Sequence, residues 1–262
     1  MLQTADKASE LYAKNLDKVL SELEIKVLAT LGNAKTGRDA FDAATILNSR
    51  GEFLKALSDA GYNELANQHI AKYPNIIDEV KKDFLDMNLP PVKLNTANVA
   101  NLKSIAQADL EMFKAIGTKA MDDLRLELFR HSVANRPFSE MVETVKAATV
   151  GLTKQARSSV TGELLRTKDG KLYKRSPLAN YSYTHANTAV LNFNGEVIRE
   201  AGEALGAEKW EVVGPVDDVT RDECLDAMGD PVRTAKEWKD AGYWGGSPGG
   251  WNCRHQLYPV FD

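Results

Sequence analysis

The chain contains 262 residues, of which 43% are hydrophobic and 27% charged, and its formal net charge is −4. This length provides one or two domains with sizeable cores, and two cysteines are too few for a disulfide-built secreted scaffold. The acidic balance excludes a uniformly basic nucleic-acid coat, and we expect neither a signal peptide nor a membrane span. These features predict a soluble, globular protein of the cell interior.

Apolar residues recur at every third or fourth position between Tyr12 and Leu31. This is the spacing of one buried helical face, and Gly32-Asn33 is typical of a helix end. The sequence therefore predicts a first long helix, whose apolar stripe we interpret as bundle core.

Shorter helices are expected within 38–60 and 62–88, where the composition remains helix-forming. Gly51 and Gly61 are the predicted breaks within this part. Pro90-Pro91 ends the run, because proline lacks the N–H donor of a helix interior and restricts the residue before it.

A second apolar stripe runs from Val99 to Leu128, and Asn95-Thr96 supplies a cap before it. Two helices of this length predict that residues 1–150 form a helical bundle or an extended helical arm. Since His69 and His131 have no second ligand four residues away, we interpret both as structural histidines.

Helices are next expected at 138–148 and 153–165, followed by a hairpin at 164–175 whose turn is Asp169-Gly170. From residue 154 to 175 there are seven basic and two acidic residues, a local charge of +5. One interpretation is contact with nucleic acid or with an acidic partner; the other is a solvated, exposed hairpin. The candidate contact residues are Arg166, Lys168, Lys171, Lys174 and Arg175.

Residues 151–262 are expected to form a small α+β domain, so the fold class is mainly α with this C-terminal addition. Its predicted elements are a helix at 178–205, strands at 210–213 and 256–260, and helical patches near 220–228 and 234–241. Four tryptophans, Trp210 among them, fall in the last fifty-three residues; we expect them to supply the core of this domain, whereas an exposed pair would suit a protein interface.

Both cysteines lie in this tail, together with His255 and Asp217. Cys224, Cys253, His255 and Asp217 are ligand types that zinc prefers, provided that the loop between the cysteines folds back. A disulfide between the two cysteines and two packed free thiols are the alternatives, and the residues alone leave the three open.

The acidic turn before Cys224 has a structural interpretation. Thr220 is expected to cap a helix with Glu223 completing a capping box, while Asp217 and Asp218 favour the positive end of that helix. Arg254 is expected to brace the nearby backbone or to pair with these aspartates. Phosphate-binding, nucleophile-elbow and zinc-protease motifs are all missing, so no catalytic residue is assigned.

The tail resembles the phage Mu F-like minor head proteins, the phage head morphogenesis family. The resemblance rests on Trp210, on Asp218, Thr220 and Cys224 of the acidic turn, on Gly229, and on the Asn252-Cys253-Arg254-His255 segment. It extends over about residues 130–262. The chain departs from the family pattern in having Gly250-Trp251 where His-Pro is common, Thr184-His185 where a Thr-Glu pair is usual, and Val219 in place of an arginine.

The resemblance implies a non-enzymatic structural protein of a tailed bacteriophage, acting in head morphogenesis and in DNA packaging or ejection near the portal vertex. Its expected partners are portal or capsid proteins, packaged DNA and further copies of the chain, without a required cofactor unless zinc is bound. Its expected location is the virion head, and the host cytoplasm during assembly. The alternatives are a zinc-dependent hydrolase or toxin-like effector domain, and a DNA-binding accessory protein that acts through residues 154–175.

Overall fold

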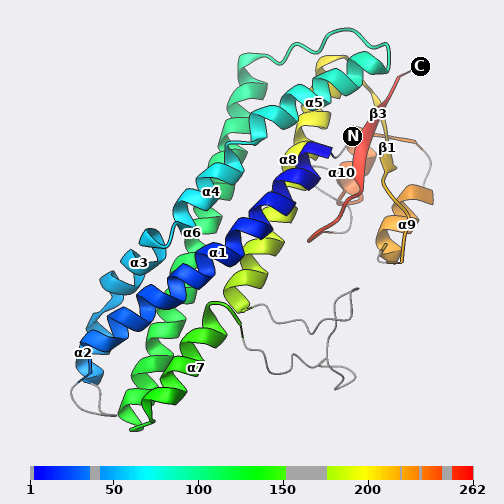
Figure 1. Ribbon diagram of the computed structural model, residues 1–262. Helices are drawn as coiled ribbons and strands as arrows, with labels where there is room; N and C mark the ends of the chain where they lie inside the picture. Colours follow the sequence, from blue (N-terminus) through cyan, green and yellow to red (C-terminus); the bar gives the residue numbers. More distant parts are fainter. Residues whose placement is uncertain are drawn as a thin grey trace. The chain divides into compact units, whose positions relative to one another are not determined.

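The computed structural model describes residues 3–35, 42–151, 176–218, 220–229, 232–243 and 250–261. It is mostly helical, with long helices and a small three-stranded antiparallel sheet near the C-terminus, which confirms the predicted fold class (Figure 1). Within these ranges, no helix has both the length and the apolar composition needed to cross a bilayer.

The chain forms two compact units. Unit 1 comprises Met1–Leu11, Gln68–Glu111 and Thr184–Asp262, and unit 2 comprises Tyr12–Asn67 and Met112–Tyr183. The sequence boundary expected near residue 150 is adjacent to 152–175, outside the described residues, and stays a prediction. The helix expected at 153–165 and the basic hairpin at 164–175 fall in the same range.

Unit 2 contains most of the first long helix, α1 (Gln3–Asn33), whose predicted stripe is buried at Tyr12, Leu16, Leu20, Leu23, Val27 and Leu31. Around it are α2 (Ala43–Asn48), α3 (Arg50–Asp59), most of α4 (Tyr62–Ile70), the later part of α6 (Thr96–Val133), and α7 (Phe138–Ala148). Tyr12 packs on Phe113 with ring centroids 5.2 Å apart. Gly117 of α6 allows a close approach, since a Cβ there would lie 2.7 Å from the Tyr62 ring.

The predicted break at Gly51 is wrong, and residues 71–72 separate α4 from α5 at a break that was not predicted. Gly51 lies inside α3, and the chain breaks at Ser49 instead, where the hydroxyl donates 2.7 Å to the carbonyl of Ile46. Gly61 is a break as expected: its φ of +89° is in the left-handed region that favours glycine.

The helical core of unit 1 is formed by α5 (Tyr73–Asp86), the start of α6 and most of α8 (Pro177–Ala204), with the first residues of α1. Its buried residues include Ile76, Val80 and Phe84 of α5 and Phe193, Val197 and Ile198 of α8. Tyr73 packs against Phe193 with ring centroids 4.1 Å apart. The weakening considered at Asn194-Gly195 does not interrupt α8.

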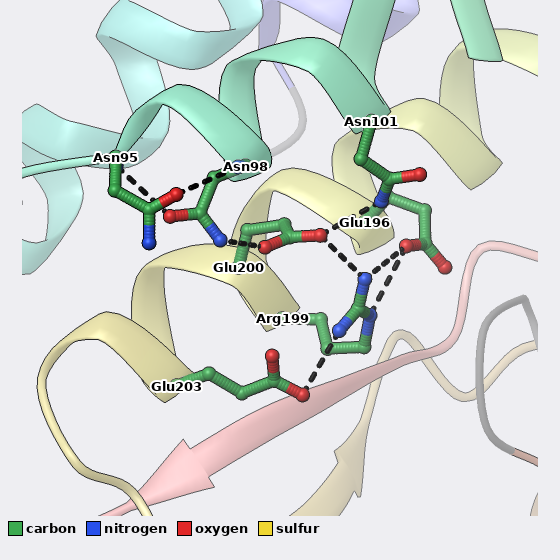
Figure 2. A network of polar contacts seen from close by, with 7 residues as sticks. All are labelled: Asn95, Asn98, Asn101, Glu196, Arg199, Glu200 and Glu203. Atoms are coloured by element: carbon green, nitrogen blue, oxygen red, sulfur yellow. Dashed lines mark hydrogen bonds and ion pairs between the residues drawn. The ribbon is translucent and has the colours of Figure 1, made fainter. Parts of the chain in front are cut away.

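A polar network joins α6 to α8 within unit 1 (Figure 2). Glu200, 5% exposed, accepts hydrogen bonds from the side-chain amides of Asn98 and Asn101 and pairs with Arg199 at 2.7 Å. Asn95 caps α6 as predicted, because the Asn98 N–H donates to its side chain at 3.0 Å and its own N–H donates to Asn98 Oδ1 at 2.9 Å.

Arg199 lies among three glutamates, because it also pairs with Glu196 and Glu203 at 2.8 and 2.9 Å. Burial alone would lower the pKa of Arg199, but hydrogen bonds and the charges of Glu196 and Glu203 outweigh it and raise the pKa. The buried carboxylate and its cation are thus mutually compensated.

The sheet of unit 1 has the order β2-β1-β3, with β1 (Lys209–Val213) in the centre. Both neighbours, β2 (Arg233–Thr234) and β3 (Gln256–Val260), are antiparallel to β1, and Trp210 lies opposite Arg233 and Pro259. Two short helices accompany the sheet, α9 (Asp222–Gly229) and α10 (Ala235–Asp240). Thr234 and Glu237 form a capping box at the start of α10.

The tryptophans of the tail divide between core and surface. Trp210 and Trp238 are fully buried in a second core with Val212, Ala227 and Leu257, and Trp238 Nε1 donates 2.8 Å to the carbonyl of Trp210. Trp251 is 59% exposed, contrary to the expectation that it belongs to this core. Trp244 lies outside the described residues.

Candidate metal centre

The candidate centre lies where β1 ends and β3 begins. Val213 pairs with Gln256 in the antiparallel register, so Gly214 and His255 are the next opposed residues along the two strands. They approach so closely that a Cβ on Gly214 would lie 2.4 Å from His255 Cδ2 and 2.9 Å from His255 Cα. Only glycine at position 214 leaves room for the imidazole in this place.

Two thiols meet this imidazole. Cys224 comes from α9 and Cys253 from the turn before β3, and their sulfur atoms lie 3.5 Å apart. Cys253 Sγ lies 3.6 Å from His255 Nδ1, and the three donor atoms all lie within 4.8 Å of one another. Cys224, Cys253 and His255 are 2%, 5% and 3% exposed, so the described residues bring three buried metal-ligand types to one point.

The same burial disfavours the charged forms of Cys224 and His255. Burial, together with the neighbouring Cys253 thiol, raises the pKa of Cys224 to about 11. Burial also lowers the pKa of His255, and the Pro215 backbone opposes this effect.

The turn that places Cys253 depends on two left-handed residues. Gly250 has a φ of +69° and Asn252 a φ of +57°, and the Cys253 N–H donates 3.2 Å to the Gly250 carbonyl. Asn252 is also anchored to α8, since its N–H donates 2.9 Å to Thr188 Oγ1 and its side chain accepts from Asn187 Nδ2 at 2.9 Å. These contacts explain the glycine and the asparagine of this segment.

The acidic turn closes over the same segment. Arg254 pairs with Asp217, which is one of its two expected roles, and Arg221 Nη2 donates 2.7 Å to the Trp251 carbonyl. Thr220 does not act as the predicted helix cap: its hydroxyl oxygen accepts from the Asp217 N–H at 2.8 Å, and its one proton is shared between Asp217 Oδ1 at 3.2 Å and the Pro215 carbonyl at 3.3 Å. Since α9 begins only at Asp222, this hydroxyl closes the loop that precedes the helix.

The remaining candidate residues do not belong to the group of potential metal ligands. Asp217 lies outside the group of potential ligands and pairs with Arg254, although its charge acts on His255. Asp218 and Gly229 are exposed, and a Cβ on Gly229 would meet nothing within 4 Å. The basic candidates Arg166, Lys168, Lys171, Lys174 and Arg175 lie outside the described residues, and their role in contact stays a prediction.

A hollow of about 390 Å³ adjoins the cluster. Its lining is mostly apolar and shares Gly214, Pro215 and Arg254 with the centre. A small apolar group could enter it beside the guanidinium of Arg254.

Sequence reasoning missed several residues that position the centre. Gly214 and the α8 pair Asn187 and Thr188 carry no motif of their own, because their roles arise only from the strand register and from the contact with Asn252. Gln256 is a further case: it is buried, accepts from Asn194 Nδ2 at 2.7 Å and donates to the Leu191 carbonyl at 2.8 Å. The available signal in the sequence was a glutamine within the predicted strand 256–260, directly after His255.

No protein-family model, no curated protein and no solved structure matches this chain. The likeness to the phage head morphogenesis family therefore rests on the motif residues of the tail.

Proposed function

We propose that the chain is a structural minor head protein of a tailed bacteriophage, acting in head morphogenesis and in DNA packaging or ejection near the portal vertex. The observation that carries the proposal is that the two separate segments of the motif form one folded unit. Asp217 contacts Arg254, Arg221 contacts Trp251, and Cys224 contacts Cys253. Cys224, Cys253 and Arg254 belong to the residues on which the resemblance rests, and these contacts give a structural reason for all three.

The segments around the centre also offer apolar contact surface. Val216 and Trp251 are 65% and 59% exposed, and Leu225 on α9 is 42% exposed. Exposed aromatic and aliphatic side chains of this kind supply anchors in protein interfaces. In the proposed role they contact portal or capsid subunits during assembly in the host cytoplasm.

The alternative of a zinc-dependent hydrolase needs an ion that is open to substrate. Cys224, Cys253 and His255 are all at least 95% buried, which favours a structural over a catalytic site. The DNA-binding alternative depends on residues 154–175 and stays a prediction.

The test is to purify proheads and virions from the phage or prophage that encodes the chain and to quantify the protein by mass spectrometry. We expect a low copy number relative to the major capsid protein and co-purification with the portal. Absence from both particles would refute the proposal.

A matched pair of variants locates the contact surface. Phage lacking the gene are complemented with wild type, Trp251→Ala or Tyr181→Ala, the last changing another aromatic residue that is 68% exposed. We expect Trp251→Ala to be incorporated into heads several-fold less than wild type, and Tyr181→Ala to be incorporated normally. Equal incorporation of all three would exclude Trp251 from the contact.

A further inference from the structure

We propose that Cys224, Cys253 and His255 bind a zinc ion that joins α9 to the segment just before β3. The inference concerns a metal site and does not depend on the proposed role in the phage head. Either one can fail without the other.

Two of the three donor separations fit a tetrahedral ion. With Zn–S of about 2.3 Å and Zn–N of about 2.0 Å, tetrahedral angles place two sulfurs about 3.8 Å apart and a sulfur about 3.5 Å from a nitrogen. The observed separations are 3.5 Å between Cys224 Sγ and Cys253 Sγ, and 3.6 Å between Cys253 Sγ and His255 Nδ1. The third pair, Cys224 Sγ and the His255 ring nitrogen, lies within 4.8 Å, so zinc binding requires these two atoms to approach by up to about 1 Å.

The donor set favours zinc among the divalent cations. Thiolate and imidazole ligands suit zinc, whereas magnesium and calcium require oxygen ligands. On binding, each thiol loses its proton to solvent and forms a sulfur–zinc bond, while the imidazole binds as a neutral ligand. Two thiolates balance the charge of Zn²⁺, so the buried site becomes electrically neutral without oxidation or reduction.

The surroundings hold the third ligand in place. The absence of a side chain at Gly214 makes room for the His255 ring. Nδ1 of this ring lies 3.6 Å from Cys253 Sγ, whereas Nε2 is buried without a hydrogen-bond partner among the described residues. A ligating histidine commonly donates its second N–H to a backbone carbonyl, which fixes the tautomer and the ring orientation. The Pro215 carbonyl, which acts on the ring, is the candidate for this role when zinc is bound.

Asp217 is not assigned as a ligand. Its carboxylate pairs with Arg254 and accepts a hydrogen bond from the Thr220 hydroxyl at 3.2 Å. The described residues therefore supply three of the four ligands of a tetrahedral ion.

The first experiment measures zinc in the full-length protein purified from zinc-supplemented medium without chelator. We expect about one zinc per chain in wild type, less than about a tenth in Cys224→Ser, Cys253→Ser and His255→Asn, and full content in His131→Asn and Asp217→Asn. His131→Asn is the matched control, because His131 is a partly buried histidine of α6. Zinc-free wild type, or full zinc content in His255→Asn, would overturn the proposal; loss in Asp217→Asn would overturn the three-ligand assignment.

A second experiment needs no variant and therefore does not depend on variant folding. Metal-free wild type is titrated with Co²⁺ and then with Zn²⁺ in weakly buffered solution. We expect the intense visible bands of tetrahedral cobalt with a thiolate charge-transfer band, displacement of both by zinc, and release of about two protons per ion. A protein that shows no such bands while its two thiols remain reduced, or whose cysteines are isolated as a disulfide, would refute the zinc centre.

Discussion

Two buried polar clusters in the described part of unit 1 differ in how their polar and charged groups are satisfied. In the first, both oxygens of Glu200 accept hydrogen bonds from Asn98 and Asn101, and Arg199 neutralises the charge (Figure 2). In the second, two thiols and an imidazole lie within 4.8 Å of one another, and burial disfavours the charged forms of Cys224 and His255.

The difference separates a structural cluster from a candidate binding site. A carboxylate with a cation and two amide donors needs nothing more, since a buried charge is tolerated when it is paired and hydrogen-bonded. Thiols are weak hydrogen-bond donors, so two thiols and an imidazole at ligand spacing stabilise one another little. The cluster is stabilised when a cation replaces the thiol protons and binds the three groups. The first cluster should therefore be insensitive to metal, and the second should depend on it.

The largest effect is expected from Glu200→Ala. Removal of this carboxylate leaves Asn98, Asn101 and part of Arg199 without their buried partner, which should lower the free energy of unfolding by about 3–5 kcal/mol. Urea unfolding followed by circular dichroism measures the loss, and chelator should not change it. Glu203→Ala is the control, because Glu203 contacts the same arginine but its side chain is 41% exposed, so we expect less than about 1 kcal/mol. Equal losses of unfolding free energy in Glu200→Ala and Glu203→Ala would contradict the importance of the buried position of Glu200.

The next largest effect concerns His69, another buried polar residue of unit 1: acidification should lower the free energy of unfolding by up to about 3 kcal/mol through this residue. Burial lowers its pKa to about 4, and its Nε2 lies 3.1 Å from the Ala186 carbonyl. Since the unfolded chain binds the proton near pH 6.5 and the folded chain only near pH 4, this stability is present above pH 6.5 and is lost as the pH falls towards 4.

The measurement is urea unfolding at pH 7.5 and at pH 4.5 in the presence of chelator, for wild type and for His69→Gln. Wild type should lose more stability on acidification than the variant, whose side chain does not titrate. A parallel loss in both proteins would argue against a buried, neutral His69.

Gly214→Ala tests whether the thiol–imidazole cluster depends on shape. The new Cβ would overlap the ring and the backbone of His255, so we expect a loss of about 2 kcal/mol and weaker metal binding. Gly229→Ala should change neither, because a Cβ meets nothing within 4 Å at the end of α9. Chemical denaturation and zinc content measure both effects, and similar behaviour of the two variants would count against the role of Gly214 in making room for the ring.

The smallest effect is expected at Asn252, whose φ of +57° positions the Cys253 turn. Asn252→Ala should cost about 1 kcal/mol, because alanine tolerates the left-handed region poorly, whereas Asn252→Gly should retain most of the stability. Thermal unfolding of the two variants is compared directly. A glycine variant as unstable as the alanine variant would shift the explanation from the backbone to the contact with Asn187.

The long elements could be predicted because their signals are local. The stripe from Tyr12 to Leu31 and the cap at Asn95 specify α1 and α6 through neighbouring residues alone, and both helices form as expected. The two-residue strand β2 was missed, because its pairing with Lys209 and Trp210 depends on a partner more than twenty residues away. The predicted break at Gly51 was wrong for a different reason: an isolated glycine is tolerated within a helix, and Gly51 lies inside α3.

The candidate centre could be predicted only in part. The ligand types of Cys224, Cys253 and His255 are visible in the sequence, but their convergence depends on how β3 pairs with β1. Asp217 is grouped with them by its place in the sequence, yet Arg254 competes for its carboxylate. The spacing of residues along the sequence shows neither which distant strands pair nor which of several partners a side chain contacts.

The core of unit 1 has a consequence for synthesis on the ribosome. Ala5 and Ala8 of α1 share this core with Tyr258 of β3, about 250 residues further along the chain. At a translation rate of roughly 5–20 residues per second, the start of α1 is synthesised tens of seconds before Tyr258, its neighbour in the core. Unit 1 therefore completes its core after translation has passed residue 258, and until then the nascent chain must keep the apolar face of α5 and α8 away from other growing chains.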